Sequence, residues 1–276
     1  TIHTLKKLKF DKNLNLDLEK DPIKKVNEQV LEWANDQKKE MALLHANEEY
    51  RKEFLGNISH ELKTPIFSIQ GYVETLLDGA INDNEVNMQF LQKIANNADR
   101  LNILVKDLLD ISKLESSSSS IEYSEFDVYE LTKEIFETNL SHALNRNIKL
   151  NIKEGCDHSF YVIADINKIT QVLTNLIINA IYYGKENGNV LVSFYDMHDN
   201  TLIEVSDDGE GIEEEHLPRL FERFYRTDKS RARHKGGTGL GLAIVKHIIE
   251  AHNQTINVRS SIGIGTTFGF TLKAKK

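Results

Sequence analysis

The sequence predicts an α+β protein of two domains, in which a helical hairpin that pairs with a second copy is followed by an α/β sandwich. Apolar residues recur every three, four or seven positions from about Ile23 to Leu77, and again from Leu91 to Ile111. This spacing is typical of helices packed along a seam. After the serine run Ser116–Ser120, short β-like stretches alternate with helical patterns, which is the texture of an α/β domain.

The two apolar stripes predict the hairpin and its partner. Turn and polar residues from Asp78 to Asn84 separate them. Each stripe is too long to be buried by one partner helix, so we expect a homodimer that forms a four-helix bundle. Upstream the seam is weaker, because Gln37, Glu48 and Arg51 stand where apolar residues are expected.

These patterns set the expected domain boundaries. We expect a helical connector over residues 1–47, the hairpin over 48–115, a serine linker over 116–120 and the α/β domain over 121–276. The expected strands cover Ile148–Ile152, Val190–Tyr195, Leu202–Val205 and Thr266–Leu272. The expected helices of this domain are Val128–Ala143, Asn167–Tyr183 and Gly241–Ala251.

Composition excludes several classes of protein. The formal net charge of -8 disfavours a nucleic-acid partner, which rewards a clustered basic face. A single cysteine, Cys156, cannot form an internal disulfide, which fits a reducing compartment. No run approaches the roughly 20 apolar residues that cross a bilayer. Because the chain starts at Thr1 without a methionine, we expect a soluble, cytoplasmic fragment of a protein anchored in a membrane upstream.

The first candidate site lies on the first hairpin helix, in the segment FLGNISHELKTP from Phe54 to Pro65. His60 falls between the seam residues Ile58 and Leu62, so helical geometry turns it toward solvent. An imidazole in water is largely neutral at pH 7, and one ring nitrogen keeps a lone pair for attack on phosphorus. Glu61 can hold or accept the proton of the other nitrogen. Pro65 is expected to bend the helix.

Two asparagines define a second candidate site. Asn175 and Asn179, in NLIINA, lie four residues apart on one face of a predicted helix. Amide oxygens can join phosphate oxygens and water around Mg²⁺, which prefers hard oxygen ligands. A solvated stripe is the alternative for this pair alone.

The segment DDGEG follows an apolar strand and gives a third candidate. Asp207, at the strand end, can accept a hydrogen bond from an adenine amino group. Gly209 and Gly211 let the backbone approach the base closely. Taken alone, the segment also fits a tight acidic turn.

A glycine-rich segment, GGTGLG, leads into a predicted helix. Flexible backbone and a helix N-terminus together suit a polyphosphate. The spacing differs from a dinucleotide fingerprint, and the segment lacks the ending of a P-loop. The residues that we assign to it as nucleotide contacts are Gly237, Thr238, Gly239, Leu240 and Gly241.

Two further segments complete the pattern. Arg226, in LFERFYR, precedes a polar, basic run and is a candidate for stabilising charge on a γ-phosphate beneath a mobile lid. The segment SSIGIGTTFGFTL predicts a turn at Gly263 and Gly265 before a strand that begins at Thr266.

Together these segments resemble sensor histidine kinases of bacterial two-component systems. SHELKTP resembles the phosphoacceptor box, and the asparagine, DDGEG and glycine segments resemble the nucleotide boxes, in the family's order, from about Glu48 onward. The resemblance implies a dimerisation and phosphoacceptor hairpin followed by a Bergerat-type ATP-binding sandwich. It also implies that Asn179 is the metal ligand and that Tyr183 and Thr266 contact the nucleotide.

The implied reaction is phosphorylation of His60 by Mg²⁺-ATP, followed by transfer to an aspartate on the receiver domain of a response regulator. Thr64 resembles the residue that orients water in the reverse, phosphatase reaction. One position departs from the family, because Tyr182 stands where a basic residue is common. This tyrosine favours one alternative, a nucleotide-binding dimeric scaffold with little kinase activity. An ATPase or chaperone of the same sandwich type is a second alternative, but it would not need the exposed histidine segment. The stimulus, the cognate regulator and the choice between cis and trans transfer do not follow from the sequence.

Overall fold

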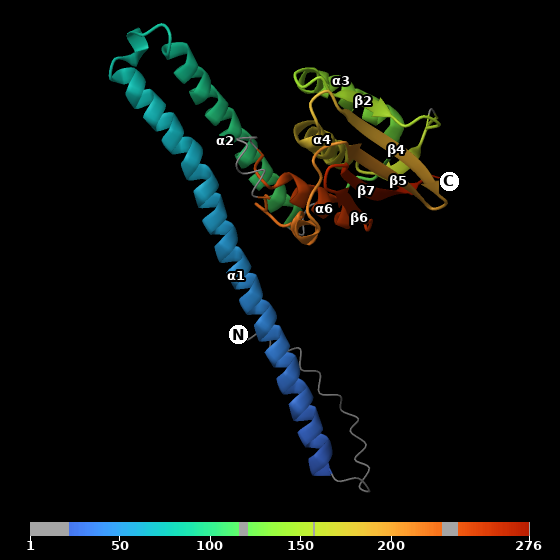
Figure 1. The fold of residues 1–276 in the computed structure, drawn as a ribbon. Coiled ribbons are helices and arrows are strands. Elements are labelled where there is room, and N and C mark those ends of the chain that lie inside the picture. The colour runs from blue at the N-terminus through green and yellow to red at the C-terminus, as the bar shows by residue number, and fades with distance from the viewer. Residues whose placement is uncertain (1–21, 116–120, 157, 228–236, 276) are drawn as a thin grey trace. The chain divides into compact units, whose positions relative to one another are not determined.

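The computed structural model describes residues 22–115, 121–156, 158–227 and 237–275 (Figure 1). The predicted serine linker, the basic run of the predicted lid and the first 21 residues of the predicted connector lie outside these ranges. The chain divides into two compact units, residues 1–57 and residues 58–276. Among the described residues, no helix has both the length and the apolar character that a bilayer crossing requires.

The first described element is the long helix α1 (Pro22–Leu77), which contains all described residues of the first unit. Its upstream seam residues are exposed in the single chain, with Trp33 61% and Leu44 62% accessible. Because apolar side chains so exposed gain from burial, this part of α1 is suited to pairing with another helix. The helix runs through Pro65 without interruption, and the bend expected there stays a prediction.

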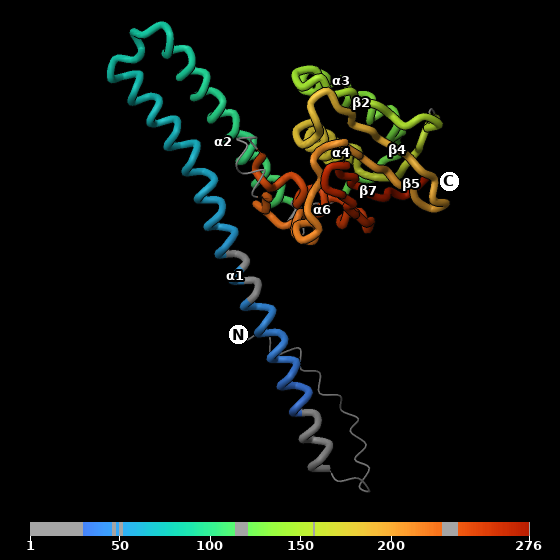
Figure 2. Tube along the Cα trace, in the orientation of Figure 1, coloured from blue at the N-terminus to red at the C-terminus, as the bar shows by residue number. Residues whose placement is uncertain are grey.

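The chain then reverses to form the hairpin. The short helix η2 (Ala80–Asn82) follows Gly79, whose φ of 118° lies in the left-handed region that favours glycine. Helix α2 (Asn87–Glu115) returns beside the last part of α1, as Figure 2 shows. The rings of Tyr72 and Phe90, with centroids 5.5 Å apart, pack between the two helices near the turn. The predicted helical hairpin is therefore confirmed.

The second domain is built on one mixed sheet with seven strands in the order β1-β3-β7-β5-β4-β2, and β6 also pairs with β7. All pairs are antiparallel except the parallel pair of β2 and β4. The last strand in the chain, β7, therefore lies between β3 and β5. The strands are β1 (Ser124–Asp127), β2 (Lys149–Ile152), β3 (Tyr161–Ala164), β4 (Asn189–Met197), β5 (Asn200–Asp207), β6 (Ile256–Ser261) and β7 (Gly265–Ala274).

Helices α3 (Val128–Leu144), α4 (Ile166–Tyr183) and α6 (Gly241–Ala251) pack side by side against this sheet (Figure 1). Asp127 caps α3 by accepting a hydrogen bond from Tyr129 N, and Asp165 caps α4 in the same way through two amides. The inward faces of α4 and α6 form the core with β5 and β7. The fully buried side chains of this core include Ile169, Leu173, Leu176, Ile177, Ile203, Ile244, Ile248 and Phe270.

The expected helices and strands of this domain all exist, with ends within a few residues of the prediction. The short helix η3 (Glu214–Arg219) and strands β1, β3 and β6 are additional. β1 and β3 have only four residues each, too few for an alternating pattern to emerge. In β6 every second residue is exposed, so the strand has a polar sequence.

Candidate functional site

The segment predicted to contain the phosphoacceptor lies on α1, where His60 is exposed. Within the described part of the chain, its imidazole makes no hydrogen bond. The Thr64 hydroxyl donates to the His60 carbonyl oxygen at 3.3 Å, so Thr64 is held one turn away on the same helix. The ring is therefore open to solvent, as helical spacing predicts.

The carboxylate of Glu61 pairs across the hairpin. Arg100 Nη2, on α2, donates to Glu61 Oε2 at 3.0 Å, and both side chains are about 30% exposed. The pair links the two helices of the hairpin beside His60. In this arrangement Glu61 contacts Arg100, and it would have to turn from α2 to receive a proton from His60.

Asp207 ends β5 and lies in the α/β domain. Its Oδ1 accepts hydrogen bonds from Gly209 N at 2.9 Å and Thr266 N at 3.3 Å, which fixes the carboxylate between two turns. Its Oδ2 makes no hydrogen bond to any described residue, so this oxygen can accept from a ligand. Burial raises the pKa of Asp207 to about 6, against the lowering effect of the two amides, so the group is still ionised at pH 7.

The turns on either side of Asp207 require glycine. A Cβ at Gly211, whose φ is 73°, would lie 2.1 Å from Ser261 O, and a Cβ at Gly209 would lie 2.4 Å from Tyr183 O. Real side chains do not tolerate such distances, so the DDGEG turn contacts both the end of α4 and the β6–β7 turn. Ser260, which the sequence does not single out, joins the same turns because Ile212 N donates to its Oγ at 2.8 Å.

Helix α4 carries both asparagines to the glycine-rich segment. A Cβ at Gly241, the first residue of α6, would lie 3.8 Å from the Asn175 amide. Asn179 is half-buried one turn further along α4. The last residue of that helix, Tyr183, approaches the same segment, since its hydroxyl would lie 3.9 Å from a Cβ at Gly237. The structure therefore brings the asparagine, DDGEG and glycine segments together around the end of α4.

Residues before the predicted lid are tied to the glycine segment as well. Phe224 N donates to Gly239 O at 2.9 Å, and Arg226 Nη1 donates to Gly237 O at 3.0 Å. Phe224 has a φ of 61°, which is uncommon for an aromatic residue and points to a constrained backbone. Arg226 is thus at the glycine segment, where a γ-phosphate contact was expected.

The side chains of Thr238 and Leu240 have partners within the protein, and the nucleotide contacts expected of these two residues stay a prediction. The Thr238 hydroxyl donates to Asp107 Oδ2 on α2 at 2.7 Å, and it accepts from Leu240 N at 3.2 Å. Burial raises the pKa of Asp107 above its ordinary value. The Leu240 side chain is fully buried. Both residues hold the segment in place in this arrangement, and the Leu240 side chain belongs to the core.

Among the described residues, one group of three acidic and histidine side chains lies close enough together to bind a metal ion. The ligand atoms of Glu213, Glu215 and His216 lie within 4.8 Å of one another at η3. His216 Nδ1 is already hydrogen bonded to the Tyr225 hydroxyl at 2.8 Å. This pair connects η3 to the segment before the predicted lid, and the cluster does not include Asn179.

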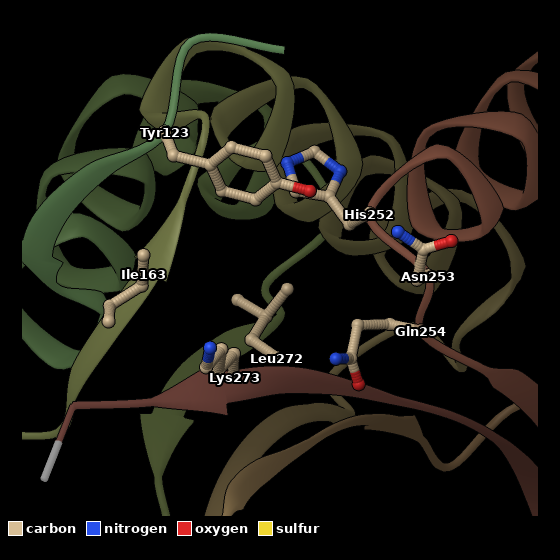
Figure 3. A pocket seen from close by; sticks show the side chains of 7 residues that line it. All are labelled: Tyr123, Ile163, His252, Asn253, Gln254, Leu272 and Lys273. Carbon is tan, nitrogen blue, oxygen red and sulfur yellow. The ribbon is translucent and has the colours of Figure 1, made fainter.

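A separate pocket of about 380 Å³ contains none of the predicted site residues (Figure 3). The buried His252 is one of its lining residues, and its Nδ1 lies 2.7 Å from Ile248 O while its Nε2 accepts from Asp165 N at 3.1 Å. Nε2 therefore joins the end of α6 to the start of α4, while Nδ1 contacts a carbonyl of α6 itself. The lining residues are Tyr123, Ile163, His252, Asn253, Gln254, Leu272 and Lys273.

Comparison with known protein families assigns both domains. Residues 50–117 match the His Kinase A (phospho-acceptor) domain, and residues 164–276 match the histidine kinase-, DNA gyrase B-, and HSP90-like ATPase. The first match contains His60 and the hairpin from residue 50 onward, and the second contains strands β4 to β7 and the three segments predicted to bind nucleotide.

Curated relatives of the same kind align with most of the chain. The sensor histidine kinase WalK of Bacillus subtilis is 39% identical over 238 residues, covering 82% of this chain and 37% of that protein. Sensor protein SrrB of Staphylococcus aureus is 34% identical over 232 residues, covering 83% of this chain and 39% of that protein. The chain thus spans less than half the length of these relatives.

Solved structures agree with the fold. Acinetobacter baumannii histidine kinase AdeS has a TM-score of 0.64 at 28% identity, covering 79% of this chain and 98% of that chain. Histidine kinase ThkA, solved in complex with response regulator protein TrrA, has a TM-score of 0.67 at 27% identity, covering 81% and 61% of the two chains. Since both domain families match in this order and relatives align with most of its length, the chain belongs to the sensor histidine kinases.

Proposed function

We propose that this chain binds ATP at the end of α4 and transfers its γ-phosphoryl group to His60. The observation that carries the proposal is the geometry of Asp207, an ionised, half-buried carboxylate with one oxygen fixed by two amides and the other available. Such an acceptor suits the exocyclic amino group of adenine. Gly209 and Gly211 let the turn beside this carboxylate pack directly against the backbone of Tyr183 and Ser261, which fixes its position.

The phosphate end of the nucleotide would lie toward the glycine segment. Amides of Gly237 to Gly241 and the N-terminus of α6 suit a polyanion. Asn175 is adjacent to Gly241, and Arg226 donates to Gly237 O, so both can turn to phosphate oxygens. We propose Tyr183 and Thr266 as further nucleotide contacts.

The amide oxygen of Asn179 is a hard, neutral donor, and the residues around the end of α4 fit Mg²⁺ as a partner of the phosphates. When bound, Mg²⁺ would neutralise phosphate charge. We propose Asn179 as the protein ligand.

The proposed chemical step is in-line displacement. A neutral His60 nitrogen attacks the γ-phosphorus, the N–P bond forms, and the bond from phosphorus to the bridging oxygen breaks, which releases ADP. The proton on the other ring nitrogen passes to Glu61 after that carboxylate leaves Arg100. Positioning and charge neutralisation supply most of the catalysis.

The proposed partners follow from the hairpin. Several of its apolar side chains are exposed in one chain, including Val73 at 38%, Leu91 at 48% and Val105 at 46%. A second copy would bury them in a four-helix bundle. A response-regulator aspartate is proposed as the next phosphoryl acceptor, in line with the partner of ThkA. Thr64, exposed one turn from His60, is proposed to orient water in a reverse, phosphatase reaction.

Incubation with γ-labelled ATP and Mg²⁺ tests the proposal, with His60→Gln as the matched control. We expect label that is lost in acid, survives alkali and is absent from the variant, because phosphohistidine is acid-labile. The alternative is a nucleotide-binding scaffold, which Tyr182 favours because it brings no positive charge. ATP binding without any labelled protein would support that alternative.

A further inference from the structure

The C-terminal end of α4 presents the last carbonyl groups of the helix and no cation of its own. The last turn of this helix contains no basic residue, and Tyr182 and Tyr183 are its final residues. The end of a helix carries a partial negative charge on such carbonyls. A polyphosphate bound nearby would be repelled by that charge unless another group neutralised it.

The same end of α4 sets the position of the nucleotide segments. The carbonyl of Tyr183 lies against Gly209 in the DDGEG turn, and its hydroxyl lies near Gly237 in the glycine segment. A shift of the last turn would therefore move both segments relative to Asn179, which is on the preceding turn. Whatever fixes this helix end also fixes the geometry of the site.

Arg146, from the loop between α3 and β2, holds that end. Its Nη1 donates to the carbonyls of Ile181 and Tyr182, and its Nη2 donates to Gly184 O at 3.1 Å. Its own carbonyl accepts from Asn187 N at 3.2 Å, so the backbone of the arginine is fixed as well. A planar guanidinium can serve three carbonyls at once, and its charge opposes the negative helix end.

We infer that Arg146 is a positioning residue for nucleotide binding. Its guanidinium supplies the positive charge that the last turn of α4 lacks. The inference rests on the proposed function, since it takes ATP to bind beside α4. In the structure the guanidinium donates to protein carbonyls, so it acts through the helix and not by touching the reacting atoms. Its loss should weaken ATP binding while leaving the chemical step intact.

The test compares Arg146→Gln and Arg146→Lys in the whole chain. ATP affinity is measured by displacement of a fluorescent ATP analogue in Mg²⁺, well below each variant's melting temperature. We expect Arg146→Gln to raise the Kd for ATP about tenfold, which corresponds to about 1.4 kcal/mol of binding free energy. Arg146→Lys should lie between, because an ammonium cannot span the three carbonyls.

Two further readouts separate this role from general stability. The autophosphorylation rate at saturating ATP should stay within about twofold of the wild type. Arg259→Gln is the matched control, because this arginine on β6 pairs with Glu204 on β5 and not with the end of α4, so its Kd for ATP should not change. A lower melting temperature with unchanged Kd in Arg146→Gln, or a lower saturated rate at unchanged Kd, would overturn the inference.

A second substitution tests the charge itself. Tyr182→Lys in the Arg146→Gln background returns a cation to the same turn of α4, and we expect it to recover a large part of the lost ATP affinity. No recovery would overturn the claim that Arg146 replaces a missing cation. If the wild-type chain does not bind ATP, the proposed function fails together with this inference; ATP binding that Arg146→Gln leaves unaltered would overturn the inference alone.

Discussion

Asp207→Asn separates the cost of a buried carboxylate from its use in binding. The amide keeps the shape of the side chain, and its oxygen can still accept from Gly209 N and Thr266 N. What it removes is the charge, and the acceptor character of the second oxygen. Stability and ATP affinity should therefore change in opposite directions.

The magnitude follows from the pKa of Asp207, which burial raises from 3.8 to about 6. A carboxyl with a raised pKa binds its proton more tightly in the folded state, so the wild type loses stability as pH rises from about 4 to 6. At about 1.36 kcal/mol for each tenfold change in an acid constant, the full loss is roughly 3 kcal/mol, of which roughly 2 kcal/mol falls between pH 4.5 and 7.5. The Asp207→Asn variant would have no such dependence.

Calorimetry of both proteins at pH 4.5 and 7.5 measures this difference, and other titrating groups cancel in the comparison. The melting temperature of the variant should rise relative to the wild type by about 4–8 °C between these pH values, at about 2–4 °C for each kcal/mol. A difference in melting temperature that does not change with pH would refute the raised pKa.

ATP binding provides the second half of the same test. The variant should bind ATP at least about tenfold more weakly, since a hydrogen bond to a charged acceptor is lost. For the wild type, affinity should fall about tenfold between pH 7.5 and 5, because protonated Asp207 cannot accept at its second oxygen. Equal ATP affinity for the two proteins at pH 7.5 would remove Asp207 from the adenine site.

Three other changes have defined outcomes. Gly211→Ala should lose measurable ATP binding and about 1–3 kcal/mol of stability, since its Cβ would lie 2.1 Å from Ser261 O at a φ of 73°; equilibrium binding and thermal melting check both effects. Ile177→Ala should cost about 2–5 kcal/mol in urea denaturation, because the side chain is fully buried on α4, whereas a value below about 1 kcal/mol would contradict the core assignment. Chelation of Mg²⁺ should abolish labelling of His60 and readdition should restore it, and labelling that persists in excess chelator would show that no divalent ion is needed.

Much of the fold could be predicted because its long elements have strong periodicity. Helices α1, α2, α4 and α6 each repeat an apolar face over several turns, and strands β4, β5 and β7 are long and apolar. Strands β1 and β6 are only partly buried, so they contain exposed polar residues such as Glu125 and Arg259. These residues weaken the apolar pattern by which a strand is recognised in a sequence. Such strands are defined by hydrogen bonds to neighbouring strands, and these partners cannot be read from the sequence.

The site was predictable where chemistry is local and unpredictable where it depends on distant partners. Asp207 and the glycines are recognisable from type and spacing, and the structure brings them together. Arg146 gives no local signal, since its three carbonyl partners lie 35 to 38 residues away in sequence. The pairing of Glu61 with Arg100, separated by 39 positions, is of the same kind. Burial of Leu240 likewise depends on packing between elements that are distant in sequence.

The place of β7 in the sheet has a consequence for how the domain is made. This strand pairs with β3, β5 and β6, yet it follows all of them in the chain. During synthesis on the ribosome, the edges of β3 and β5 that pair with β7 remain without a partner strand until β7 has been made. Unpaired strand edges are prone to pair with other chains. A premature stop codon before Gly265 would therefore leave an aggregation-prone remnant and not a weakened kinase.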